Sequence, residues 1–313
     1  MSKIATLLPT LVTALVCLLP AVPAQAQAAR TFVSAAGSDS NNCTNVATPC
    51  RHLAIAYAAT AANGEIDVLD PANYGALTIT GPVSIEGHGW AAISAVSGSA
   101  AITINANPGD KINIIGVVLD GTNLGGTTSI SFNSGGSLTV RDSVVRNFGY
   151  DGIDFYPTAS GTVFISNTLL SDNGGTGIAV TSTGSGTTNG VLNHVDMVNN
   201  EDGIIVQSTT QTVNVTISDS ASANNTAAGI GAESDDGMML SVMVRNSTSA
   251  NNGTDGLYAS GAGATVPATR STITGNITGW STPSGGVVTS YGDNNIDGNG
   301  SANTEPPNPL TYK

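Results

Sequence analysis

Acidic side chains recur at a fixed place in the middle of the chain, directly before a repeated glycine. Asp151 and Asp202 hold this place in the segments "YDGIDFY" and "EDGIIVQ". Two carboxylates about 6.5–9.5 Å apart can act as general acid and general base in an inverting glycosidase. These two would approach that separation only if the fold stacked their segments side by side. The candidate catalytic residues are then Asp151, Asp154, Asp202 and Arg146.

Aromatic rings near the same glycines would suit a sugar ligand. Tyr156 follows Asp154 by two positions, and Tyr258 follows Gly256 by two positions. A tyrosine offers an apolar ring and a polar hydroxyl, which match the two sides of a sugar. A purely structural role stays open, because aromatic residues are favoured on β-sheet surfaces in any case.

A second polar set contains His194 and Asp219. If they lie side by side, His194 is a candidate base and Asp219 the group that orients it. The alternative is a solvated ladder of hydrogen bonds along one polar column, whose members are Asp142, Asn167, His194, Asp219, Asn246 and Arg270. We count His194 and Asp219, together with Tyr156 and Tyr258, as candidate ligand-binding residues.

A sequence repeat is the element that would stack such residues. A glycine followed by an apolar residue returns with a period near 25, at Gly152, Gly177, Gly203, Gly229, Gly256 and Gly279. Short alternating runs such as "TVFIS" and "GIAV" are broken by Gly, Asn and Ser, which indicates strands and turns. This period favours one rung of a parallel β-helix, whose strands stack about 4.8 Å apart. Asp151 and Asp202 would then lie about 9.6 Å apart, and the neutral residues between the acids would relieve repulsion.

Aligning the repeats predicts three apolar columns that point inward, because side chains alternate along a strand. The first holds Val140, Ile165, Leu192, Ile217, Val244 and Ala268. The second holds Ile153, Ile178, Ile204, Ile230, Leu257 and Trp280, and the third holds Phe155, Val180, Val206, Ala232 and Ala259. Turn asparagines should form a hydrogen-bonded ladder. They are Asn147, Asn173, Asn200, Asn225, Asn252 and Asn276.

The first part of the chain is typical of a targeting segment. Residues 1–28 contain Lys3, an apolar run and the small residues Ala24 and Ala26, which predicts a secretory signal peptide. No later stretch reaches about 18 uninterrupted apolar residues, so we expect no transmembrane segment in the mature chain. We therefore expect a secreted protein, in the periplasm, at the cell surface or outside the cell.

The segment after the leader predicts a cap for the repeat. Residues 29–64 should form this cap, with a short helix that has Thr48 as N-cap, Pro49 at its first position and Gly64 just past its end. Cys43 and Cys50 are close in sequence and predict one disulfide in an exported protein. Residues 65–300 should form the β-helix, and residues 301–313 an irregular tail rich in proline.

The charge balance narrows the choice of partners. The chain has 22 acidic residues against nine Lys and Arg, for a net charge of −13. This argues against nucleic acid and anionic lipid as partners. It also weakens the case for a polyanionic sugar unless calcium intervenes. We therefore predict no cofactor, with calcium left open and no metal-binding residues assigned.

The order of these features resembles the right-handed parallel β-helix (pectin-lyase-like) superfamily. The resemblance is carried by "GEIDVLDPANYG", "LTITGPVSIEGHG" and the rungs with Asn turns and Gly-Ile pairs. It implies right-handed coiling, so we expect an all-β, single-stranded, right-handed parallel β-helix with a short capping helix. Roughly 285 mature residues and a period near 25 give about ten rungs. It also implies a lateral groove that faces polysaccharide. Such a fold hosts many activities, so the site must decide between them.

The catalytic motifs of the superfamily are incomplete in this chain. The basic residues that pectate lyases use beside calcium-binding aspartates are scarce here. Gly87-His88-Gly89 resembles one polygalacturonase motif, but it comes early and no Arg-x-Lys follows. The signatures of pectin methylesterases and alginate epimerases are missing.

These observations leave three hypotheses for function. The first is a binding protein that uses a polar lateral face, with polysaccharide or cell-surface glycan as its partner. The second is a polysaccharide lyase or glycoside hydrolase, and the third is a structural or adhesin-like element of the cell surface.

Overall fold

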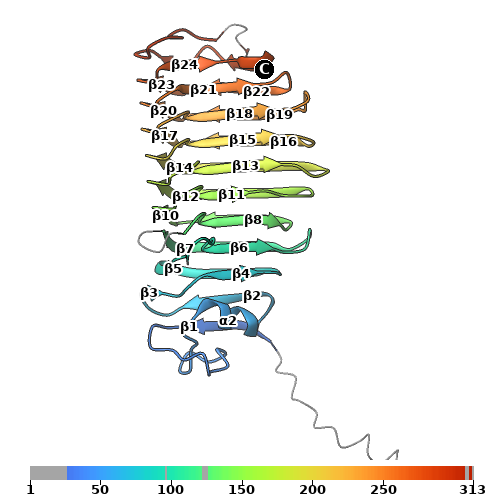
Figure 1. Cartoon of the computed structure of the whole chain (residues 1–313), viewed down its shortest axis with the longest axis vertical. Coiled ribbons are helices and arrows are strands. Elements are labelled where there is room, and N and C mark those ends of the chain that lie inside the picture. The colour runs from blue at the N-terminus through green and yellow to red at the C-terminus, as the bar shows by residue number, and fades with distance from the viewer. Residues whose placement is uncertain (1–26, 96, 122–125, 307–309, 312–313) are drawn as a thin grey trace, which may run out of the picture.

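The chain coils into an elongated stack of parallel strands (Figure 1). A computed structural model describes residues 27–95, 97–121, 126–306 and 310–311. The predicted leader, residues 1–28, lies outside the described residues except for Gln27 and Ala28. All the strand pairs of the described residues are parallel, which confirms the predicted β-solenoid.

One side of the stack is a nine-stranded sheet with one strand from each coil. Its strands are β4 (Leu77–Ile79), β6 (Ile102–Asn105), β8 (Ile130–Ser134), β11 (Ile153–Phe155), β13 (Ile178–Ser182), β15 (Ile204–Ser208), β18 (Ile230–Ser234), β21 (Asp255–Ser260) and β24 (Thr278–Ser281). The solenoid makes about eight turns, slightly fewer than the ten rungs expected.

The other strands form a seventeen-stranded sheet that bends around the rest of each coil. In its first half these are β1 (Ala28–Val33), β2 (Thr60–Val68), β3 (Ala72–Asn73), β5 (Val83–Ile93), β7 (Lys111–Asp120), β9 (Ser137–Arg141), β10 (Val144–Arg146) and β12 (Gly161–Ser171). In its second half these are β14 (Thr187–Val198), β16 (Thr212–Ser218), β17 (Ala221–Ala223), β19 (Leu240–Arg245), β20 (Thr248–Ala250), β22 (Ala264–Thr269), β23 (Thr272–Thr274), β25 (Val287–Ser290) and β26 (Asn295–Ile296). A short 3-10 helix, η2 (Pro283–Gly285), precedes β25.

The core consists of the three predicted apolar columns. Strand register pairs Val140 with Ile165, and the same column continues to Ala268. Ile153 pairs with Ile178, and that column runs through Ile204 to Trp280. The members are buried apart from Trp280, which is partly buried against the end of the core. The predicted register is therefore confirmed.

The polar column that contains His194 and Asp219 lies at a corner of the coil. Its members all adopt positive φ, between 47° and 55°, in the middle of the bend. Only a few residue types tolerate this left-handed region, and Asn, Asp and His are enriched there. The polarity of the column therefore follows from backbone conformation at the corner.

The turn asparagines form the predicted ladder inside the coil. Asn200 donates from its backbone N–H and its Nδ2 to Oδ1 of Asn225, at 3.0 and 3.4 Å. Asn225 repeats both donations to Asn252 at 3.2 and 2.9 Å, and the ladder extends to Asn299. Each side chain thus satisfies a buried backbone amide on the preceding turn.

The prediction for Asn147 is wrong. Phe148 occupies the corresponding buried position, and its N–H donates to Oδ1 of Asn173 at 3.1 Å. Asn147 sits one residue earlier at φ 62° and donates to Asp120 at 3.1 Å. A bulky ring thus ends the ladder, because phenylalanine cannot accept a hydrogen bond.

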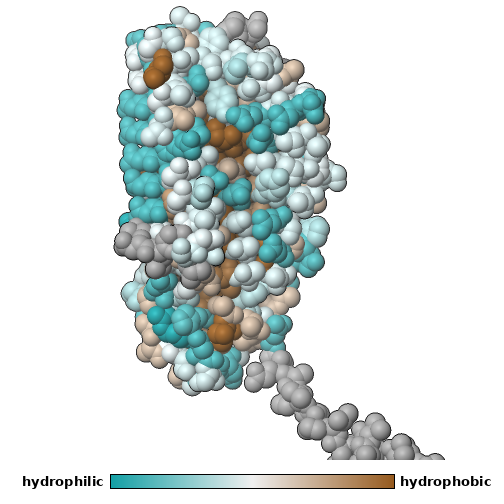
Figure 2. Space-filling view, viewed as in Figure 1, coloured by the Kyte–Doolittle hydropathy of each residue, from teal (hydrophilic) through white to brown (hydrophobic). Residues whose placement is uncertain are grey.

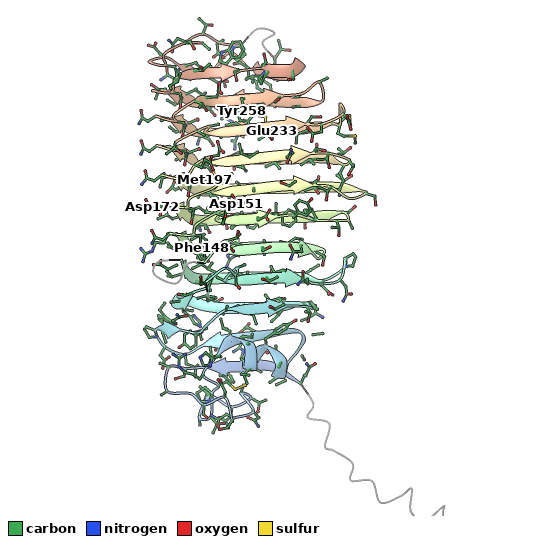
Figure 3. The ribbon with its side chains drawn as sticks, viewed as in Figure 1. Phe148, Asp151, Asp172, Met197, Glu233 and Tyr258 are labelled. Atoms are coloured by element: carbon green, nitrogen blue, oxygen red, sulfur yellow. A yellow bond between two sulfur atoms is a disulfide. The ribbon has the colours of Figure 1, made fainter. Side chains whose placement is uncertain are left out.

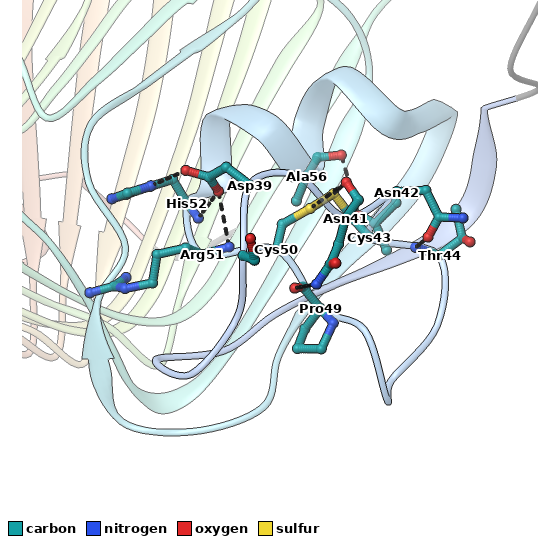
Figure 4. Close-up of a disulfide and its surroundings, with 12 residues drawn as sticks. Asp39, Asn41, Asn42, Cys43, Thr44, Pro49, Cys50, Arg51, His52 and Ala56 are labelled. Carbon is teal, nitrogen blue, oxygen red and sulfur yellow. Dashed lines mark hydrogen bonds and ion pairs between the residues drawn. A yellow bond between two sulfur atoms is a disulfide. The ribbon is translucent and has the colours of Figure 1, made fainter.

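The N-terminal cap contains the predicted disulfide and a shorter helix than predicted (Figure 4). Cys43 and Cys50 are joined, and both are buried. Helix α2 (Leu53–Ala59) begins after the N-cap residue His52, so the predicted start at Pro49 is wrong. Cys50 instead pairs with Val33 in a parallel bridge, which holds this segment extended. The end at Gly64 is also wrong, because β2 begins at Thr60.

Candidate functional site

The nine-stranded sheet presents a continuous row of outward side chains, because alternate residues on its strands face the core. From β4 to β24 the row is Thr78, Thr103, Ser131, Asp154, Ala179, Ile205, Gly231, Tyr258 and Ser281. We call this side, with the turn residues just before each strand, the outer face. Small side chains dominate the row, so Asp154 and Tyr258 are its two large functional groups.

Asp154 is a half-buried carboxylate at the centre of β11. Among the described residues it has no hydrogen-bond or ion-pair partner. Burial raises the pKa of its carboxyl to about 6, and the neighbouring charge of Asp151 raises it further. Asp154 is therefore a group that can hold or release a proton near neutral pH.

Asp151 and Asp202 occupy equivalent places before β11 and β15. Oδ1 of Asp151 accepts a hydrogen bond from the N–H of Thr176 at 2.8 Å, and Oδ1 of Asp202 accepts one from Ala228 at 2.7 Å. Each acid thus accepts a hydrogen bond from the backbone of the neutral residue at the same place on the next turn. This bond links the acidic and neutral residues that alternate before the repeated glycines. Burial raises the pKa of both carboxyls despite these bonds, and nearby acids add to the effect.

The ring of Tyr258 reaches over Gly231 on the neighbouring strand. A Cβ placed on Gly231 would be 2.3 Å from Cε1 of Tyr258, so the ring covers the space that this glycine leaves empty. The hydroxyl of Tyr258 donates to Oε1 of Glu233. Burial raises the pKa of the hydroxyl, and the hydrogen bond to Glu233 raises it further. Figure 3 shows Tyr258 and Glu233 together on the nine-stranded sheet, with Asp151 nearer its middle.

Two further tyrosines lie beside this row. Tyr156 directly follows β11 and is 37% exposed, with its backbone N–H bonded to Phe132. Tyr150, in the turn before Asp151, is 63% exposed. The sequence interpretation did not include Tyr150 or Glu233. The strand register would have revealed Glu233, because it aligns with Gln207 on the outward side of β15.

The structure places three candidates away from the outer face. Arg146 ends β10 in the seventeen-stranded sheet and forms an ion pair with Asp120 at 2.9 Å. His194 contacts the amide oxygen of Asn193 at 2.7 Å, and Asn193 in turn donates to Asp219 at 3.3 Å. His194 and Asp219 are thus linked through an amide at the corner column. A hydrogen bond from Asn246 lowers the pKa of Asp219.

His88 belongs to another surface cluster. Its Nε2 lies 2.7 Å from Oδ1 of Asp67, and its ring packs against Trp90 with centroids 5.3 Å apart. Its φ of 54° sets it at the same kind of corner as His194. These contacts account for His88 structurally.

The described residues contain no group of three or more His, Cys, Asp or Glu side chains arranged to hold a metal ion. Within the same residues, no helix is long and apolar enough to cross a membrane.

Comparison with known proteins supports the fold and defines the family. The family described as "Right handed beta helix region" matches residues 100–264. Pectate lyase Pel9A is structurally similar, with a TM-score of 0.56 and 18% identity, over 86% of this chain and 70% of that chain. The A-module of the mannuronan C-5 epimerase AlgE4 from Azotobacter vinelandii gives a TM-score of 0.46 and 15% identity, over 80% of this chain and 90% of that chain. No curated protein matches the sequence. The chain belongs to the right-handed β-helix family.

Proposed function

We propose that this protein is exported and binds carbohydrate along the outer face of the nine-stranded sheet. The observation that carries the proposal is the ring of Tyr258, which covers Gly231 and has its hydroxyl bonded to Glu233. A ring whose orientation is fixed by a neighbouring strand can contact the apolar side of a sugar at little conformational cost. Asp202 and Asp154 add hydrogen-bond acceptors farther along the same face, two and four strands from Tyr258, or about 10 and 19 Å away.

Two independent features are consistent with this function. The solenoid shares its fold with a pectate lyase, whose name denotes action on a polysaccharide. The disulfide between Cys43 and Cys50 suits an oxidising compartment, in accord with the predicted leader. Together they support an extracellular glycan as the partner.

The test is a titration of the purified full chain with a panel of neutral, amino-sugar and uronic-acid oligosaccharides. Tyr258→Ala should weaken binding at least tenfold, about 1.4 kcal/mol, whereas Tyr258→Phe keeps the ring and should retain most of the affinity. Phe164→Ala is the matched control, because Phe164 is an exposed ring on β12 of the other sheet. Unchanged binding in Tyr258→Ala, or no binding to any glycan in the panel, would refute the proposal.

A second candidate is polysaccharide cleavage at the same face, and it rests on Asp154. Burial and the neighbouring Asp151 raise the pKa of the Asp154 carboxyl to about 6, a value that suits a general acid. The same oligosaccharides should then yield new reducing ends, or the ultraviolet absorbance of an unsaturated product for a lyase. Asp154→Asn should abolish either product. If the parent protein forms neither product, binding remains the only function proposed for this face.

A further inference from the structure

The outer face carries acidic groups without basic ones. The nine strands of its sheet contain no Lys or Arg. Its acids lie on the strands or in the turns just before them, and they are Asp151, Asp154, Glu201, Asp202, Glu233 and Asp255. With strands about 4.8 Å apart, the stretch from Asp151 to Asp255 covers four coil steps, or about 19 Å. This length suits several consecutive sugar units.

Three arginines form ion pairs on the seventeen-stranded sheet instead. Arg30 pairs with Glu65 at 2.8 Å, Arg141 with Asp142 at 3.4 Å and Arg146 with Asp120 at 2.9 Å. These residues belong to β1, β9 and β10, so they do not lie on the strands of the outer face. Positive charge that compensates the outer face would therefore come from a ligand.

The acids of this face are also crowded. Burial has the largest effect on the Asp202 carboxyl and raises its pKa. The negative charges of Glu201, Glu233 and Asp151 raise this pKa further. Burial and the charge of Asp151 likewise raise the pKa of Asp154, which has no hydrogen-bond or ion-pair partner among the described residues. A half-buried carboxylate in this setting gains most from a cation that can donate hydrogen bonds, because charge-assisted bonds are the strong ones.

We propose, on the basis of the carbohydrate-binding function above, that the outer face selects glycans with free amino groups. Ammonium groups of the glycan pair with Asp154 and Asp202, while a neighbouring sugar ring stacks on Tyr258. A uronic-acid polymer would meet like charges along the whole face. A neutral glycan would use the ring of Tyr258 but leave the charge of Asp154 uncompensated.

The experiment compares four ligands of equal length on the full chain at pH 6 and low salt. They are a glucosamine oligosaccharide, its N-acetylated counterpart, and an oligogalacturonate with and without calcium. We expect the glucosamine oligomer to bind at least tenfold tighter than the N-acetylated one, and its affinity to fall as salt is added. Oligogalacturonate should bind at least tenfold more weakly than glucosamine in both conditions.

Two variants that each remove one negative charge, together with one control, test whether the acids of the outer face cause the preference for glucosamine. Asp154→Asn and Asp202→Asn should each reduce affinity for the glucosamine oligomer at least fivefold more than they reduce affinity for the N-acetylated oligomer. Asn at position 202 keeps the Oδ1 acceptor that holds the N–H of Ala228. Asp172→Asn is the matched control, because Asp172 lies at the left edge of the stack in Figure 3. Figure 2 shows a hydrophilic band along that edge in the same view. Its φ of 58° is tolerated by Asn.

The outcomes separate this inference from the proposed function. Equal or tighter binding of the N-acetylated oligomer would overturn the amino-sugar preference and leave carbohydrate binding in place. Tight binding of oligogalacturonate only with calcium would overturn it in favour of a bridged polyanion. Binding of none of the four, together with no binding in the wider panel, would remove the proposed function itself.

Discussion

The hydroxyl of Tyr258 on β21 donates a hydrogen bond to Glu233 on β18, and the tyrosine ring covers Gly231 between them. The two side chains are 25 residues apart in sequence and lie on adjacent strands. The glycine is essential to this arrangement, because any Cβ at position 231 would collide with the ring. The sheet thus presents one large ring in a row that otherwise consists mainly of small side chains.

Gly231→Ala should therefore lift the ring of Tyr258 without removing it. We expect roughly tenfold weaker glycan binding, about 1.4 kcal/mol, because the ring loses its fixed orientation. Isothermal titration with the best ligand of the panel measures this. Ala179→Gly, in the same row two strands away, serves as the control. Full affinity in Gly231→Ala would show that the position of the ring over Gly231 is not needed.

The raised pKa of Asp154 predicts a specific pH dependence of stability. The folded carboxyl has a pKa of about 6 against the ordinary 3.8, so the folded state binds more protons than the unfolded state between these values. The stability contribution of Asp154 therefore falls as pH rises from about 4 to 6. Asp154→Asn should remove this loss, roughly 1–2 kcal/mol after allowance for partial solvent exposure. Urea unfolding at pH 4 and pH 7 measures it, and parallel pH profiles for parent and variant would contradict the assignment.

Core substitutions should separate inward from outward positions on a single strand. Ile204→Asp places a charge in the buried column and should unfold several coils, a cost of several kcal/mol. Ile205→Ser, at the next position, faces outward and should change stability by about 1 kcal/mol or less. Thermal melting followed by circular dichroism compares them. A parent-like melting temperature for Ile204→Asp would mean that the register is wrong.

The asparagine ladder should be sensitive to loss of donors. Asn225→Asp removes the Nδ2 donations to Met197, Ser222 and Asn252 and buries a charge. We expect a loss of at least 3 kcal/mol in the free energy of unfolding. Asn224→Asp is the control, because its side chain is exposed and Asp tolerates its φ of 57°. Equal stability of the two variants in urea unfolding would argue against the ladder as a main source of stability.

The sequence predicts the repeated part of this fold well. Gly-Ile pairs at a steady period align the strands, and side-chain alternation then assigns Ile153 and its stacked partners to the core. Helix α2 starts later than its Thr48-Pro49 signal suggests, since the bridge from Cys50 to Val33 holds that segment extended. Local capping signals carry no information about such a distant strand partner.

The candidate site was only partly predictable. Asp154 and Tyr258 follow from the same register as the core, but the contact of Tyr258 with Glu233 depends on a glycine one strand away. The corner column of His194 was interpreted as a polar face, although its residue types suit left-handed backbone equally well. Positive φ is a property of the coil geometry, which a single repeat does not reveal.

The most direct test of carbohydrate binding on the outer face is the affinity of the double variant Tyr156→Ala, Asp154→Ala for the tightest-binding oligosaccharide. Both residues belong to β11 or directly follow it, and both lie apart from the core columns. The predicted result is at least a tenfold loss of affinity, about 1.4 kcal/mol, in a variant that still unfolds in one cooperative transition. An unchanged affinity in this variant, combined with a loss in variants of His194 or Asp219, would place the working surface at the corner column and contradict the account.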